Sequence, residues 1–229
     1  MTVDKIIKEL KQNADPKKIE SERRFGNQGK NMLGISVTFL RKFAKIIPKN
    51  HKLAIELWNT GIYEAKMLAS MIAEVDKATE KQMDKWVNDF DSWGICDNTC
   101  INLLCKTSFV DKKIFEYAQS EKEYVRRTAF TLIACLAVKN KELKDKDFIK
   151  YFDLIEKYAV DERNFVKKAV NWALRQIGKR NEQLNKKALK VAYDILKLDT
   201  KSARWIARGA INELEKWKPR KNIKISKFS

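Results

Sequence analysis

The sequence predicts an all-α fold in which HEAT-like repeats stack into an α-α superhelix, a curved solenoid with a basic concave face. Three observations predict it. Apolar residues recur at helical spacing along most of the chain, the 229 residues include only 7 Gly and 3 Pro, and one motif returns every 40–41 residues. β-Sandwiches and β-barrels need many turns. The small number of Gly and Pro residues therefore argues against an all-β fold.

The helices follow one another with breaks every 12–20 residues. Pro16 fits the first turn of a helix, and Pro48 stops the helix before it. We treat residues 1–229 as a single repeat domain whose last residues, 218–229, form a basic tail. The expected helical spans are 3–13, 15–24, 36–47, 50–59, 62–74, 77–90, 93–107, 111–119, 122–139, 145–159, 162–179 and 181–217, the last of them broken near 198–200.

The repeat is clearest in the second half of the chain. Residues 124–129 match residues 165–170, and residues 205–210 follow 40 positions later. Each copy has an aromatic residue, a β-branched residue, a basic residue and a small one, and we expect the aromatic residue to fill the core. Paired helices with this period are typical of HEAT-like repeats, and the alternative is a helical bundle that mimics the period by chance. The copies close at the same offset with Ile133, Leu174 and Leu214.

The charge predicts a polyanionic partner. The chain carries 48 Lys and Arg against 30 Asp and Glu, a net charge of +18, and the excess is largest in residues 1–50 and 201–229. Nucleic acid is the commonest partner of such a chain. Arg127, Lys168 and Arg208 occupy one equivalent position in successive repeats, so we expect them to form a ladder along the phosphate backbone. The alternative is that each cation extends from its own helix into solvent.

Several classes of function are disfavoured by what the sequence contains. With His51 as its one histidine and no Gly-rich phosphate loop, the chain is a poor candidate for a His-based metal site, a Ser-His-Asp hydrolase or a nucleotide-binding fold. No apolar run of 18 residues predicts a membrane span, and no signal peptide is recognisable. We therefore expect no metal, no small-molecule cofactor and no membrane partner, and a cytoplasmic monomer associated with the nucleoid. Buried reduced thiols are expected at Cys96, Cys100, Cys105 and Cys135, the first three on one helix.

One segment combines an acid and a tryptophan at helical spacing. Ser92 or Asp91 can cap a helix that begins at Trp93, and Trp93 and Asp97 then share a face of that helix. The same row continues with apolar residues, so Asp97 interrupts a row expected to face the core. A buried carboxylate needs a partner, and Arg127 is the nearest candidate.

A second tryptophan lies among cations. Trp172 shares a helix face with Lys168, Arg175 and Lys179, which suggests an exposed aromatic platform. The alternative is that Trp93 and Trp172 simply pack in or near the core, as most tryptophans do, and that Asp97 is a cap or ion pair.

The ordered set Trp93, Asp97, Arg127 and Trp172 on a basic HEAT-like chain resembles the AlkD-type DNA alkylation repair glycosylases, and the resemblance spans about residues 20–217. The Trp-x-x-x-Asp spacing, residues 124–129 and residues 166–175 resemble that family's motifs, as do residues 31–35 with Leu40 and Arg41. Between Trp93 and Asp97 the residues are less polar than the family pattern.

The resemblance implies that the protein excises cationic N3- or N7-alkylated purines from double-stranded DNA by hydrolysing the N-glycosidic bond, without flipping the lesion into a deep pocket. It implies that Asp97, Trp93 and Trp172 are catalytic and converge on the concave face. The implied DNA-binding residues are Arg126, Arg127, Lys167, Lys168, Arg175 and Arg208.

Two other hypotheses stay open. One is a non-enzymatic HEAT-repeat protein that binds distorted or branched DNA with the same cations and does not need Asp97. The other is a protein-binding scaffold with a basic convex face. No lysine is placed to form a Schiff base, so an enzyme of this kind would be a monofunctional glycosylase without lyase activity.

Overall fold

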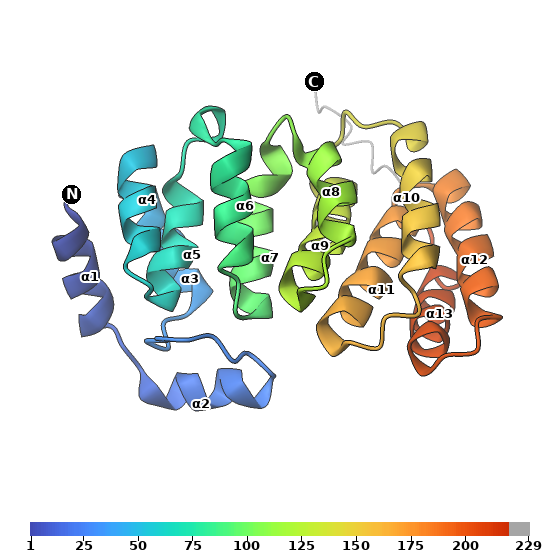
Figure 1. Ribbon diagram of the computed structural model, residues 1–229, viewed down its shortest axis with the longest axis horizontal. Helices are drawn as coiled ribbons and strands as arrows, with labels where there is room; N and C mark the ends of the chain where they lie inside the picture. The colour runs from blue at the N-terminus through green and yellow to red at the C-terminus, as the bar shows by residue number, and fades with distance from the viewer. Residues whose placement is uncertain (220–229) are drawn as a thin grey trace, which may run out of the picture. The chain divides into compact units, whose positions relative to one another are not determined.

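The computed structural model describes residues 1–219, and all of its regular secondary structure is helical (Figure 1). The chain forms two compact units, the first from Met1 to Leu136 and the second from Ala137 onward. The prediction of an all-α fold is confirmed. Residues 220–229 lie outside the described part, and with them most of the expected basic tail.

The first unit holds the helices α1 to α8 and most of α9. Within it, α5 packs against α3, α4 and α7. Their bounds are α1 (Val3–Gln12), α2 (Pro16–Arg24), α3 (Val37–Lys45), α4 (His51–Asn59), α5 (Tyr63–Ile72), α6 (Glu80–Asn88), α7 (Trp93–Asn102), α8 (Val110–Ala118) and α9 (Glu123–Lys139), with short 3₁₀ turns at η1 (Val75–Lys77) and η2 (Leu104–Lys106).

Two stacked tryptophans form the centre of that unit. The rings of Trp58 on α4 and Trp86 on α6 lie 4.0 Å apart between centroids and are parallel to within 3°. Both side chains are fully buried, and the Trp58 indole N–H donates to the carboxylate of Asp89 at 3.1 Å. The stack holds α4 against α6 through a large apolar contact, and the indole N–H of Trp58 is paired.

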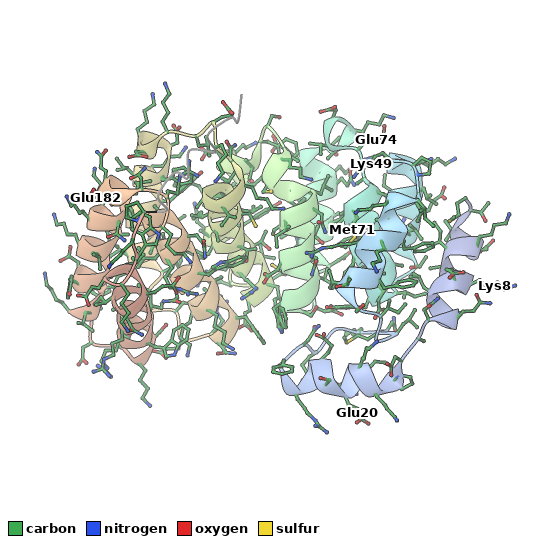
Figure 2. The ribbon with its side chains drawn as sticks, turned by 180° about the vertical axis from the view of Figure 1, so that it is seen from behind. Lys8, Glu20, Lys49, Met71, Glu74 and Glu182 are labelled. Carbon is green, nitrogen blue, oxygen red and sulfur yellow. The ribbon has the colours of Figure 1, made fainter. Side chains whose placement is uncertain are left out.

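The helix α2 is attached to the first unit by polar contacts. None of its residues is buried, and Glu20 points away from the unit (Figure 2). The loop that follows it is held by the buried Glu64, whose carboxylate accepts from the backbone N–H groups of Leu33, Gly34 and Ile35 at 2.8–3.2 Å. Burial raises the pKa of Glu64, and these N–H donors oppose that rise. On the other side of α5, the Lys49 ammonium donates to the carbonyl of Met71, beside Glu74.

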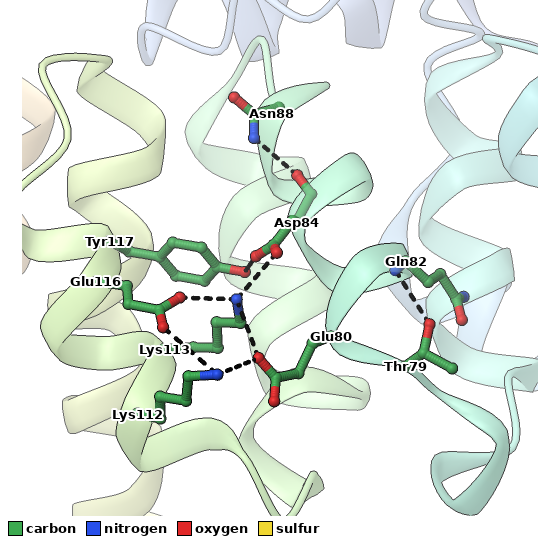
Figure 3. Close-up of polar contacts among 9 residues, drawn as sticks. All are labelled: Thr79, Glu80, Gln82, Asp84, Asn88, Lys112, Lys113, Glu116 and Tyr117. Carbon is green, nitrogen blue, oxygen red and sulfur yellow. Dashed lines mark hydrogen bonds and ion pairs between the residues drawn. The ribbon is translucent and has the colours of Figure 1, made fainter.

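Acidic residues of α6 are paired with cations of α8. The Lys113 ammonium on α8 has a side chain that is only 5% exposed, and it donates to Asp84 at 2.9 Å and to Glu116 at 2.7 Å (Figure 3). The Tyr117 hydroxyl donates to the same Asp84 at 2.7 Å. Despite burial, the surrounding carboxylates raise the pKa of Lys113. This network of ion pairs and hydrogen bonds holds α6 against α8.

The second unit holds α10 (Asp145–Lys157), α11 (Asn164–Gly178), α12 (Glu182–Leu196) and α13 (Lys201–Leu214). In it, α12 packs against α10, α11 and α13. The break expected near residues 198–200 is present, with Thr200 capping α13 through a bond from the Ala203 N–H.

The apolar core positions predicted for the repeat are confirmed, and the prediction for its aromatic position is wrong. Val125, Val166 and Ile206 are buried, as are the residues four and eight positions further along in each copy. The preceding aromatic residue was expected in the core, and this was wrong. Tyr124 and Phe165 are only half-buried, and Trp205 is 46% exposed. The neighbouring β-branched residue occupies the buried position instead, which turns the aromatic residue toward solvent.

The helix α7 is shorter than expected. It ends at Asn102, and Cys105 lies in the η2 turn, so the first three cysteines do not share one helix. All four cysteines are free and buried, as the sequence predicted. Across residues 1–219, no helix is long and apolar enough to cross a membrane.

Arg180 is expected to be a main determinant of the second unit's stability. Its guanidinium donates to the carbonyls of Ala137, Asn140 and Leu143 at 2.7–3.0 Å and lies 4.3 Å from the centroid of the Phe148 ring. Lysine cannot reach three carbonyls from one fork, so Arg180→Lys should destabilise the unit by about 1–3 kcal/mol. Thermal unfolding measures this. The exposed Lys187→Ala on α12 is the control, and equal melting temperatures for both variants would contradict the assignment.

Candidate functional site

The predicted partnership of Asp97 and Arg127 is present. Asp97 lies on α7 and Arg127 on α9, and the guanidinium donates to both carboxylate oxygens, from Nε at 3.0 Å and from Nη2 at 2.7 Å. The Thr131 hydroxyl, one turn further along α9, donates to the same carboxylate at 3.3 Å. A bidentate pair of this kind fixes the carboxylate in direction as well as position.

The two charges of this pair differ in their access to solvent. The Arg127 side chain is 7% exposed and that of Asp97 is 15% exposed. Burial opposes the guanidinium charge, but the Asp97 carboxylate more than offsets it and raises the pKa of Arg127. The burial of Arg127 argues against the phosphate contact suggested from the sequence. Arg127 instead acts as an internal counter-charge, and Asp97 is the member of the pair that reaches the surface.

The helix row that carries Asp97 lies at the boundary of the core, which corrects the expectation that it faces the interior. Trp93, Asp97 and Ile101 are all half-buried, whereas the buried face of α7 is formed by other positions. Asp97 therefore does not interrupt an apolar core row. It lies one turn from Trp93 on α7, and 15% of its side chain is exposed. The buried residues of α7 are Gly94, Ile95, Cys96, Thr99 and Cys100.

The start of α7 is fixed by the loop after α2. Ser92 is the N-cap and accepts from the Ile95 N–H at 3.4 Å, so the predicted cap is confirmed. Asp91, the other candidate, accepts from the Lys30 N–H at 2.9 Å instead. The buried Asn27 amide donates to the Tyr63 hydroxyl at 2.7 Å and to Glu22 at 2.9 Å, which links α2 to α5.

Close packing explains why position 94, between Trp93 and Asp97, is a glycine. A Cβ at this position would lie 2.1 Å from the Tyr63 hydroxyl and 3.0 Å from Asn27 Nδ2. Any side chain would therefore push α7 away from the Tyr63–Asn27 pair. Gly29 is also packed against Tyr63, because a Cβ at position 29 would lie 2.5 Å from the Tyr63 ring. Sequence reasoning missed Asn27 and Tyr63, since they are 36 residues apart and carry no shared pattern.

A cavity of about 170 Å³ adjoins Trp93 within the first unit. Trp93, Tyr63 and Met67 contribute apolar surface to it, and the buried Asn27 side chain also lines it. The Tyr63 hydroxyl titrates well above its ordinary range because burial raises its pKa, so it remains a neutral hydrogen-bonding group. The half-buried indole of Trp93 therefore lies between this recess, which it lines, and the fixed carboxylate of Asp97 one turn further along α7.

The remaining predicted residues have different surroundings. Arg126 is buried, and its guanidinium donates to the Ala118 carbonyl at 2.9 Å and to Glu121 at 3.0 Å, which gives it an internal role. In the second unit Lys168 and Arg208 are exposed, and Lys167 is half-buried. The ladder position is therefore not uniform, since its first member is the buried Arg127.

Trp172 is half-buried and not the exposed platform expected from its cationic neighbours. Its indole N–H reaches the Gln176 amide oxygen at 3.2 Å when that amide is oriented to accept it. Arg175 and Lys179 both donate to Glu213 on α13. These two cations hold α11 to α13, and the sequence pattern could not show it because the acid is more than 30 residues away.

Residues 6–214 match the family described as DNA alkylation repair enzyme. The chain belongs to that family. The resemblance inferred from Trp93, Asp97, Arg127 and Trp172 is therefore confirmed, and all four residues fall within the matched part of the chain.

Solved structures with a similar fold support the architecture of this DNA alkylation repair family member. One is described as "A new family of proteins related to the HEAT-like repeat DNA glycosylases with affinity for branched DNA structures"; it is 18% identical, covers 96% of this chain and 98% of its own, and has a TM-score of 0.76. The HEAT-like repeat prediction is thus confirmed. Two designed armadillo repeat proteins, each 17% identical, match 76% of this chain and 91% of their own at TM-scores of 0.38 and 0.40. No curated protein matches the sequence.

Gly94→Ala should destabilise the protein, although alanine normally stabilises a helix by about 1 kcal/mol relative to glycine. The reason is the Tyr63 hydroxyl, 2.1 Å from the new methyl group. Tyr63→Phe removes that oxygen, so the double variant should melt higher than the sum of the two single changes predicts. Thermal unfolding of the four proteins measures the coupling. Additive melting temperatures would show that Gly94 has no special contact with Tyr63.

Proposed function

We propose that this protein is a monofunctional DNA glycosylase that hydrolyses the N-glycosidic bond of cationic N3- or N7-alkylated purines in double-stranded DNA, without deep base flipping. The observation that carries the proposal is the partly exposed Asp97 carboxylate, which Arg127 holds in a bidentate ion pair. It lies one helical turn from Trp93 in a chain that belongs to the DNA alkylation repair family. No cofactor and no metal enter the proposed reaction.

The chemistry requires little beyond one placed anion. An alkylated purine already carries a positive charge, so it departs with the electrons of the glycosidic bond and needs no general acid. The sugar left behind resembles an oxocarbenium ion, which a nearby carboxylate stabilises. In this proposal Asp97 provides that charge next to C1′ and orients the water that attacks there, and the proton lost by the water passes to solvent.

Arg127 has a positioning role in this scheme. Because its guanidinium is buried and bonded to both oxygens of Asp97, it limits the carboxylate to one orientation. Thr131 supports the same orientation from the next turn of α9.

Contacts with DNA are assigned to the aromatic and exposed cationic residues. Trp93 and Trp172 are proposed to contact the lesion nucleotide through their ring faces, which favour a cation by roughly 0.5–2 kcal/mol. Lys168 and Arg208 are exposed, so they are the best placed of the predicted cations to meet phosphates, with Lys167 beside them. The protein is proposed to act as a monomer on chromosomal DNA in the cytoplasm.

A second candidate function is supported by the solved relative, which is described as having affinity for branched DNA structures. In that case the protein binds distorted or branched DNA without cleaving any bond, and Asp97 serves only to anchor Arg127. Base release from alkylated duplex DNA separates the two functions, since only the glycosylase releases free purine.

Asp97→Asn should abolish most base excision and keep DNA affinity. The amide retains size and polarity but removes the charge that stabilises the oxocarbenium ion, so a rate loss on the order of 10²–10³ is expected. Single-turnover release of 7-methylguanine from methylated duplex DNA measures it. Asp194→Asn is the control, because Asp194 also forms an ion pair, with Lys197, but lies on α12. Excision by Asp97→Asn at the wild-type rate would remove the carboxylate from the mechanism.

Arg127→Ala should lower the excision rate and the stability together, because it leaves the Asp97 charge without its partner. Breaking a buried pair from one side costs about 3–5 kcal/mol. Arg127→Lys keeps the charge but not the two-pronged contact, so its excision rate should lie between those of Arg127→Ala and wild type. Rates are compared at a temperature where circular dichroism shows every variant folded. Equal rates for the lysine and alanine variants would argue against a positioning role.

A further inference from the structure

An exposed tryptophan lies in a groove on the last helix of the second unit. Trp205 on α13 is 46% exposed, one of the few large apolar side chains in the described chain with so much accessible surface. The groove around it has a volume of about 530 Å³, within the range of small-molecule sites. We call it the Trp205 groove; its lining residues are Lys201, Arg204, Trp205, Arg208, Gly209 and Asn212.

Gly209 leaves the surface of α13 beside Trp205 open. In a helix the side chain four residues further on is a direct neighbour, and here that position has no side chain. Glycine inside a helix costs about 1 kcal/mol, so its presence needs a reason. One reason is internal, since a Cβ would lie 3.0 Å from Asn171 Nδ2, which donates to the Ile206 carbonyl. The result on the outside is a low, open surface beside the indole.

The groove is positively charged. The Lys167 ammonium lies 5.5 Å from the centroid of the Trp205 ring, and Lys201 and Arg208 are exposed on either side of it along α13. Among the described residues, no carboxylate lines the groove.

Of the acids close to the groove, Glu162 accepts from the backbone N–H of Ser202 at 3.0 Å, and two others are paired with cations. Asp199 accepts from Arg204 at 2.5 Å, and Glu213 accepts from Arg175 and Lys179. An anionic ligand would therefore meet the charges of Lys167, Lys201 and Arg208 without an opposing carboxylate in the lining.

We propose that the Trp205 groove binds an unpaired nucleotide of a DNA strand, with the base stacked on the indole and its phosphates held by Lys201 and Arg208. A planar aromatic surface flanked by cations is the usual means of binding single-stranded nucleic acid. A base inside an intact duplex has both faces covered by its neighbours, so only an unpaired base can use the ring. The inference rests on the proposed function for DNA as the partner, but it requires no base excision.

An acidic protein segment is the competing occupant, and stacking tells the two apart. Acidic side chains would use the cations but gain nothing specific from the indole plane. Removal of the indole should therefore weaken a single strand selectively, whereas removal of a cation weakens any anionic ligand.

The experiment compares full-length variants by fluorescence anisotropy with a labelled ten-nucleotide thymidine strand and with a blunt duplex. Trp205→Ala should weaken binding of the strand about tenfold, the effect expected for loss of one stacked base. Its affinity for the duplex should change less than twofold. Trp205→Phe retains a ring and should recover part of the loss. Tyr193→Ala is the matched control, because Tyr193 is 45% exposed in the same unit but outside the groove.

Each outcome decides the proposal. Equal weakening of strand and duplex, or no weakening, overturns it, as does a labelled polyglutamate peptide whose binding falls as much as that of the strand in Trp205→Ala. Base excision is measured on the same variants. If Trp205→Ala selectively loses strand binding and the wild type excises no base, the groove proposal is supported and the glycosylase proposal is contradicted. If the wild type excises bases and Trp205→Ala does not change strand binding, the glycosylase proposal is supported and the groove proposal is contradicted.

Discussion

The ion pair between Asp97 and Arg127 sets the arrangement of the first unit around its candidate site. It joins α7 to α9 at a place where both partners are largely shielded from water, and a lone charge there would be costly. Arg126, the preceding residue, donates to the last carbonyls of α8. Two consecutive arginines therefore hold α9 to both helices before it, one by a carboxylate and one by a helix end. These contacts fix the position and orientation of the Asp97 carboxylate, and any chemistry at Asp97 depends on that orientation.

Much of the fold could be predicted because its determinants are local. Pro16 starts α2 behind the cap of Asp15, and Ser92 caps α7, as the residue types suggest. The repeat's core positions were visible because burial of Val166 and its counterparts requires the same apolar residue at the same offset. The partner of Asp97 was also accessible to sequence reasoning, since a shielded acid needs a cation and Arg127 was the nearest candidate in the repeat.

The errors share one cause, which is that a helical pattern gives angles around a helix but not the neighbours it meets. The row of Trp93 and Asp97 proved to be a boundary and not a core face, because α7 is short and its small residues pack against α5 instead. Trp205 and Phe165 took the aromatic position of the repeat, yet the next residue fills the core. Gly94 is explained only by the Tyr63 hydroxyl, 31 positions away in the sequence. Such contacts depend on tertiary packing and leave no periodic trace.

The buried thiols of the first unit have a further chemical consequence. Cys96 and Cys100 are fully buried on the inner face of the helix that carries Asp97, and burial raises the pKa of Cys100 well above its ordinary value. The nucleophilic form of cysteine is the thiolate, so an enclosed neutral thiol reacts slowly with electrophiles. Alkylating agents are electrophiles of this kind. The same packing that fixes α7 therefore also protects these two thiols from electrophiles.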